Sequence, residues 1–125
     1  MFTQFGKVLR KIRIDRGMLL KDMAEGFGVS SAFLSAVETG KKSIPNGFVE
    51  RAALFLGYAK GSAEWDELQD AAAISKGEIA LATQGLTQKH QETALAFARH
   101  FEEMAPADLD KVLQLLNATK KRREE

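Results

Sequence analysis

The chain of 125 residues contains no cysteine. Disulfides, thiolate metal ligands and a cysteine nucleophile are therefore excluded, and nothing in the composition marks an oxidising compartment. No apolar run approaches the roughly 20 residues that a membrane-spanning helix requires. Near the amino terminus the apolar residues are interrupted by charges such as Arg10 and Lys11, so a signal-peptide core is absent too. From these absences we expect a cytoplasmic protein with no membrane partner.

The sequence is also poor in groups that would build an active site. Its two histidines, His90 and His100, lie ten residues apart, with no third metal ligand at a matching spacing. Four carboxylates between residues 102 and 110 are typical of a solvated surface, because about one domain's worth of chain can hardly enclose a catalytic pocket. We therefore expect no catalytic residue, no metal site and no cofactor, and we start from a binding module.

The net charge of +1 hides a division between the two halves of the chain. Residues 1–60 carry ten Lys or Arg against five Asp or Glu, whereas residues 61–125 carry eight against twelve. This asymmetry favours a polyanionic partner for the first half and a different role for the acidic second half.

Hydrophobic periodicity predicts five helices in the first 75 residues. Apolar residues recur three and four positions apart between Phe2 and Ile12, and Gly17 supplies the end of this first helix. In the fourth helix, Leu54 and Phe55 are expected to be mainly buried. The other expected helices cover about residues 20–27, 31–39, 47–56 and 62–74.

The second and third of these helices are separated by only Gly28-Val29-Ser30. Gly28 can adopt the left-handed conformation that ends a helix, and Ser30 can cap the next one with its hydroxyl. Helices joined so closely must cross steeply, as in a helix-turn-helix unit. In the alternative, an ordinary helical bundle, Gly28 and Gly40 are only caps, and the basic loop Lys41-Lys42 has no explanation.

The pattern changes after residue 77. Ile79 and Leu81 alternate with other residues, which indicates a short strand or an extended connection near residues 78–83; a strand would have to pair with a second copy of the chain. Helical periodicity returns over residues 88–104, and Pro106 starts a last helix. The basic tail, residues 120–125, is expected to be frayed.

Many of these residues fall into one motif. It reads Leu9-Arg10-x-x-Arg13-x-x-x-Gly17, then Met23-Ala24-x-x-Phe27-Gly28-Val29-Ser30-x-x-x-Leu34-Ser35-x-Val37-Glu38-x-Gly40. Over about residues 5–58 it resembles the phage-repressor-like, or xenobiotic-response-element, family of helix-turn-helix regulators. The resemblance implies a mainly α fold, with a five-helix lambda-repressor-like DNA-binding domain. The resemblance and the hydrophobic periodicity together predict the organisation of the chain. We expect this domain over residues 1–75, a connection over 76–86, C-terminal helices over 87–119 for dimerisation or partner binding, and a tail over 120–125.

The resemblance also implies which residues meet double-stranded DNA. The major groove, about 12 Å wide, admits one helix, and the third helix is the expected reader. The expected base-reading residues are Ser31, Ala32, Ser35 and Ala36; the alternative is a small-residue face packed on another helix. The expected phosphate contacts are Lys21, Ser30, Thr39, Lys41 and Lys42.

Two further features of the family pattern bear on this chain. The family usually has glutamine where this sequence has Leu20, and a leucine cannot hydrogen-bond to phosphate. Arg13 and Glu38 resemble the family's internal ion pair between the first helix and the end of the third, which we interpret as structural.

The apolar residues of the second half predict a homodimer interface, with packing back on the fifth helix as the alternative. The interface residues are expected to be Ile79, Leu81, Leu95, Phe101, Leu109, Val112, Leu113 and Leu116. The resulting hypothesis is a homodimeric repressor that binds an inverted-repeat operator. The alternative is an antitoxin that autoregulates its operon and binds a toxin protein through its acidic second half.

Overall fold

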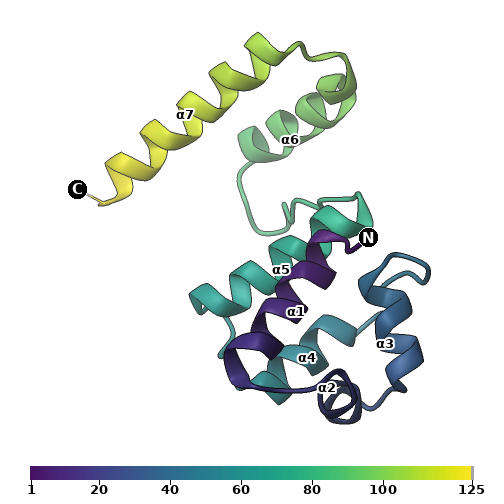
Figure 1. The fold of residues 1–125 in the computed structure, drawn as a ribbon. Helices are drawn as coiled ribbons and strands as arrows, with labels where there is room; N and C mark the ends of the chain where they lie inside the picture. Colours follow the sequence, from purple (N-terminus) through teal and green to yellow (C-terminus); the bar gives the residue numbers. More distant parts are fainter. Residues whose placement is uncertain (125) are drawn as a thin grey trace. The chain divides into compact units, whose positions relative to one another are not determined.

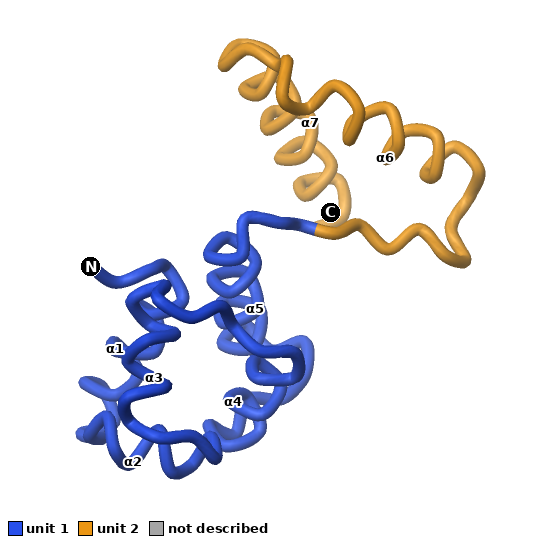
Figure 2. The backbone as a smooth tube through the Cα atoms, turned by 90° about the vertical axis from the view of Figure 1, so that its right-hand side faces the viewer, with its two compact units in different colours: residues 1–79 blue, residues 80–125 orange. Residues whose placement is uncertain are grey.

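The computed structural model describes residues 1–124 and divides into two compact units, Met1–Ile79 and Ala80–Glu125 (Figures 1 and 2). In the described residues every regular element is a helix. None of these helices combines the length and the apolar composition that crossing a lipid bilayer would need.

Unit 1, Met1–Ile79, contains the five helices predicted from the sequence, so that prediction is confirmed. Three of them begin at a hydroxyl that accepts a hydrogen bond from an amide of the first turn, supplied by Thr3, Ser30 and Ser62. The helices are α1 (Gln4–Arg16), α2 (Leu20–Phe27), α3 (Ser31–Glu38), α4 (Phe48–Leu56) and α5 (Ala63–Lys76).

A single apolar core holds unit 1 together, and Phe48 lies within it. Its ring meets those of Phe5 and Phe27 edge to face, with centroids 6.2 Å and 5.5 Å away. Helix α5, the last helix of unit 1, closes this core with the buried side chain of Leu68. Its Ser75 hydroxyl also accepts a hydrogen bond of 2.9 Å from the amide of Phe5, which ties the start of α1 to the end of α5.

The expected burial of Leu54 and Phe55 is wrong, because α4 turns these two residues away from the core. Leu54 is 82% exposed and Phe55 is 42% exposed. Phe55 instead lies over Gly26 of α2, where a Cβ atom would fall 2.3 Å from the ring. The buried residues of α4 are Phe48, Val49, Ala52, Ala53 and Leu56.

Unit 2 consists of α6 (Gln88–His100), the 3₁₀ helix η1 (Phe101–Glu103) and α7 (Pro106–Glu124). Thr87 caps α6, and the Asp108 carboxylate accepts a hydrogen bond of 3.1 Å from the amide of Ala105 at the start of α7. No side chain between residues 80 and 124 is fully buried. Unit 2 therefore has helices but no core.

Of the two alternatives predicted for residues 78–83, a short strand or a connection, the structure has the connection. Ile79 and Leu81 are 76% and 66% exposed in this irregular connection, and residues 1–124 contain no strand with which they could pair. At the predicted frayed tail, α7 continues through Glu124, and Glu125 lies outside the described residues. The cations at 120–123 favour this helix because they lie at the negative end of its dipole.

Candidate nucleic-acid interface

The turn between α2 and α3 is fixed by its backbone. Gly28 ends α2 with φ of 75° and ψ of 29°, and the amide of Val29 then donates to the carbonyl of Ala24 at 2.9 Å. Ser30 is extended, and its hydroxyl oxygen accepts a hydrogen bond of 3.1 Å from the amide of Phe33. The three-residue turn therefore sets the angle at which α3 leaves α2.

A cation from α4 supports this turn, and no motif in the sequence predicts it. The Arg51 guanidinium donates a hydrogen bond of 3.3 Å to the carbonyl of Phe27. It also lies beside Gly28, where a Cβ atom would fall 3.6 Å from Nη1 of Arg51. A positive group at the end of α2 complements the helix dipole. Since 24 residues separate Arg51 from Phe27, only the packing of α4 against α2 reveals the contact.

Helix α3 has one buried face and one exposed face of small side chains. Leu34, Val37 and Glu38 are buried. Of the predicted base-reading residues, three are exposed and Ala36 is half-buried. The alternative, in which this small-residue face packs against another helix, therefore does not hold for the exposed residues Ser31, Ala32 and Ser35.

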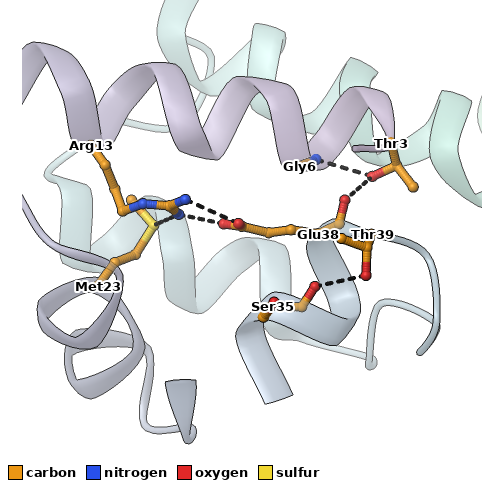
Figure 3. Close-up of polar contacts among 7 residues, drawn as sticks. All are labelled: Thr3, Gly6, Arg13, Met23, Ser35, Glu38 and Thr39. Atoms are coloured by element: carbon orange, nitrogen blue, oxygen red, sulfur yellow. Dashed lines mark hydrogen bonds and ion pairs between the residues drawn. The ribbon is translucent and has the colours of Figure 1, made fainter. Parts of the chain in front are cut away.

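The buried end of α3 is held by an ion pair with α1 (Figure 3). Both nitrogens of the Arg13 fork donate to the Glu38 carboxylate, with the Nη2 to Oε1 distance at 3.0 Å, and Nη1 also lies 3.4 Å from Sδ of Met23. Arg13 is 8% exposed and Glu38 is 1% exposed. A two-pronged pair of this kind fixes the orientation of both side chains and thus of α3 against α1.

A second contact joins the same two helices through the backbone (Figure 3). The amide and the hydroxyl of Thr3 both donate to the carbonyl of Glu38, at 2.9 Å and 3.2 Å, while the hydroxyl oxygen accepts from the amide of Gly6. Gly6 permits this approach, because a Cβ atom there would fall 2.1 Å from the Glu38 carbonyl oxygen. No local pattern in the sequence points to Thr3 or Gly6, since the contact spans 35 residues.

The residues expected to contact phosphate differ in whether their charge or hydroxyl proton is already engaged within the protein. Lys41 and Lys42, just after α3, are exposed, and within residues 1–124 no carboxylate forms an ion pair with them or with Lys21. Ser30 uses its oxygen as a cap but keeps its proton for an acceptor. The Thr39 hydroxyl cannot donate to a phosphate in this arrangement, because it donates its proton to the carbonyl of Ser35 at 2.9 Å.

The comparison with protein families adds to this geometry. Residues 4–65 match a family model described as a helix-turn-helix domain, from the start of α1 into α5. Residues 4–65 are a helix-turn-helix domain. This agrees with the resemblance to phage-repressor-like regulators, and such a domain points to a DNA-binding regulator. No curated protein and no solved structure matches the chain.

In the helix-turn-helix domain, the start of α2 is a weaker anion site than the loop after α3. As at any helix start, the amides of Leu20 and Lys21 have no acceptor within α2. The Asp22 carboxylate, however, accepts a hydrogen bond of 3.0 Å from the amide of Leu19, so a negative charge already occupies this end of the helix. A phosphate here would depend on Lys21 to offset Asp22.

Unit 1 has a group of acidic residues on a different face. A hollow of about 520 Å³ between α1 and α5 is lined by the carboxylates Asp66, Glu67 and Asp70. In Figure 1, α5 lies on the other side of α1 from α3. Such an acidic face repels a polyanion, so it is the less suitable of the two faces for a nucleic acid.

Proposed function

We propose that the protein is a sequence-specific regulator that binds double-stranded DNA through α3 of its helix-turn-helix domain. One observation carries this proposal: the exposed small-residue face of α3 is followed directly by Lys41 and Lys42, which have no acidic partner in residues 1–124. Small side chains let the helix enter the major groove closely, and the free cations supply the phosphate attraction that dominates affinity.

The chemistry of α3 limits how it can read bases. The hydroxyls of Ser31 and Ser35 can hydrogen-bond to base edges, and the methyl groups of Ala32 and Ala36 can contact thymine. None of these side chains makes the two-pronged contacts of arginine or glutamine. We therefore expect DNA shape and deformability to contribute a large share of the sequence preference.

The proposal extends to a homodimer that binds an inverted repeat. A dimer places two reader helices in successive major grooves, about 34 Å apart along the duplex. The exposed apolar side chains of unit 2 support self-association, since seven large apolar residues from Leu81 to Leu116 are at least 48% exposed. Repression by excluding RNA polymerase from a promoter is the part of the proposal supported by the family resemblance alone.

An antitoxin is a less favoured alternative once the charges are assigned to the two units. The acidity of the second half lies in unit 1: residues 61–79 carry one Lys and five Asp or Glu. Residues 80–125 carry seven Lys or Arg and seven Asp or Glu. Unit 2 therefore lacks the excess of negative charge that would favour a basic toxin.

The test of DNA binding is the salt dependence of affinity, measured by fluorescence anisotropy on a labelled duplex. The double variant Lys41→Gln, Lys42→Gln should weaken binding to all sequences and reduce the slope of log K against log salt by about 2, because two phosphate contacts are lost. The matched control is Lys60→Gln, Lys76→Gln, which removes the same charge from exposed positions in the α4–α5 connection and in α5.

An unchanged slope in the Lys41 and Lys42 variant, or an equal loss in the control, would show that the phosphate contacts are assigned wrongly. Selection of bound fragments from random DNA then supplies the operator and its half-site spacing. Ser31→Leu should change which fragments are selected while leaving the salt slope as it is. A protein that fails to bind any duplex at low salt would refute the proposed function.

A further inference from the structure

Unit 2 leaves apolar surface on α7 that the described chain does not cover. Leu109, Val112, Leu113 and Leu116 follow one another at spacings of three, one and three residues, which places them on one face of the helix. Leu109 and Val112 are only half-buried, and Leu113 and Leu116 are each 57% exposed. A helix with such a row is incomplete without a partner.

The charges of α7 are divided between its two ends. Asp108 and Asp110 lie in the first turns beside Lys111, so this end is net acidic, and four cations occupy 120–123 before Glu124, so that end is net basic. Within residues 1–124 none of these groups forms an ion pair. Asp108 and Lys121 are 13 residues apart, roughly 20 Å along the helix, which exceeds the screening length of about 8 Å at physiological salt. The two ends of one α7 therefore cannot neutralise each other.

From this apolar row and this charge division we infer that α7 pairs antiparallel with α7 of a second copy of the chain. Leu113 then lies opposite Leu116 of the second copy, and Leu109 lies opposite the stem of Lys120 of the second copy. The acidic start of each helix meets the basic end of the other. The inference rests on the homodimer of the proposed function, and it assigns the surface and the orientation of that dimer.

The opposite orientation is disfavoured by the same charges. In a parallel pair, the four cations at 120–123 would lie against the same four cations of the second copy, and the acidic ends would meet as well. Like charges at both ends would oppose the burial of the apolar row. Charge complementarity thus selects the antiparallel pair and sets its register.

The absence of native cysteine allows a direct test of this orientation. We expect the double variant Leu109→Cys, Lys120→Cys to form a covalent dimer under mild oxidation in the absence of DNA, and each single variant to stay uncrosslinked. The two positions of one chain are about 16 Å apart along α7, beyond the reach of a disulfide, so any bond must join two copies. Crosslinking of each single variant to itself would establish a parallel pair and overturn the inference.

A second test, which needs no cysteine, exchanges the charges at the two ends of α7. Lys120→Glu with Lys121→Glu should raise the dimer dissociation constant about tenfold in analytical ultracentrifugation, and adding Asp108→Lys with Asp110→Lys should restore it. The restored protein has charges that oppose both helix dipoles, so its recovery can only come from contacts between copies. A lack of restoration, or a monomeric parent chain, would overturn the inference. DNA binding by anisotropy is measured separately, so a protein that binds DNA but pairs otherwise leaves the helix-turn-helix assignment intact.

Discussion

The two units of the chain contain similar secondary structure but differ in what stabilises it. In unit 1, fifteen apolar side chains between Phe5 and Ala72 are buried, together with the pair Arg13 and Glu38. In unit 2, no side chain of residues 80–124 is buried, although α7 alone is 19 residues long. Helix content therefore does not distinguish a region with a buried core from a region without one.

The difference has an energetic basis. Burying a large apolar side chain contributes about 1.5–3 kcal/mol, whereas an isolated helix of fewer than about 15 residues is marginal in water. Unit 1 gains the first contribution many times over, whereas no side chain of residues 80–124 is buried to provide it; under the proposed function, unit 2 gains it through association. The stability of unit 1 should accordingly be independent of protein concentration, while the stability of the helices in unit 2 should rise with concentration.

The largest expected effect on unit 1 comes from breaking its buried ion pair. Glu38→Ala leaves the Arg13 guanidinium buried without its partner, which should lower the free energy of unfolding by about 3–5 kcal/mol. Urea denaturation followed by Trp65 fluorescence measures this change, because Trp65 is the only tryptophan and packs against the core of unit 1.

The control for this variant replaces both charges together. Arg13→Met with Glu38→Leu removes the pair without leaving a buried charge, so it should be less destabilising than Glu38→Ala alone. If the double variant is as unstable as the single one, the cost lies in lost packing at the end of α3 rather than in an unpaired charge.

The next effect concerns the close approach of α1 to α3. Gly6→Ala would place a Cβ atom 2.1 Å from the carbonyl oxygen of Glu38, which belongs to the backbone and cannot move alone. We expect a loss of about 1–3 kcal/mol, despite the better helix propensity of alanine. The same change at Gly26 meets only the ring of Phe55, which is 42% exposed and can turn away. Equal losses at the two sites, measured by urea denaturation, would contradict this account.

A smaller effect is expected from removing the hydroxyls that cap α3 and α5, and it separates the stability of unit 1 from DNA binding. Ser30→Ala and Ser62→Ala each remove a hydroxyl that accepts from an amide of the following helix, and each should cost about 1 kcal/mol in unit 1. Only the change at Ser30 lies beside the reader helix, so only this variant should also weaken DNA binding measured by anisotropy. Equal DNA affinity in both variants would remove Ser30 from the phosphate contacts.

The two units also differ in how much of their structure could be predicted from the sequence. The five helices of unit 1 were predictable because apolar spacing, hydroxyl caps and glycine ends agree locally, as they do around Gly28 and Ser30. For residues 78–83 the sequence left a strand and a connection open, because alternation at Ile79 and Leu81 carries no information on whether a partner strand exists; the structure has the connection. The burial of Leu54 and Phe55 was misjudged, since apolar character alone does not say which side of α4 faces the core.

The candidate site was predictable to the extent that its residues are contiguous. The exposure of Ser31, Ala32 and Ser35 follows from the helical register of α3. The contributions of Arg51 and Thr3 were not predictable, because their contacts join residues 24 and 35 positions apart. The engagement of the Thr39 hydroxyl with a carbonyl of its own helix required the structure as well.

The smallest expected effect on the stability of unit 1 comes from removing the whole of unit 2. A protein ending at Ile79 keeps every buried apolar residue, so its free energy of unfolding should match that of unit 1 in the full chain to within about 0.5 kcal/mol. The same protein should sediment as a monomer and bind an inverted-repeat duplex about 10²-fold or more weakly, because the second half-site is no longer engaged by a linked copy. A shortened chain that stays dimeric would place the interface in unit 1, and a marked loss of stability would show that unit 1 depends on unit 2 after all.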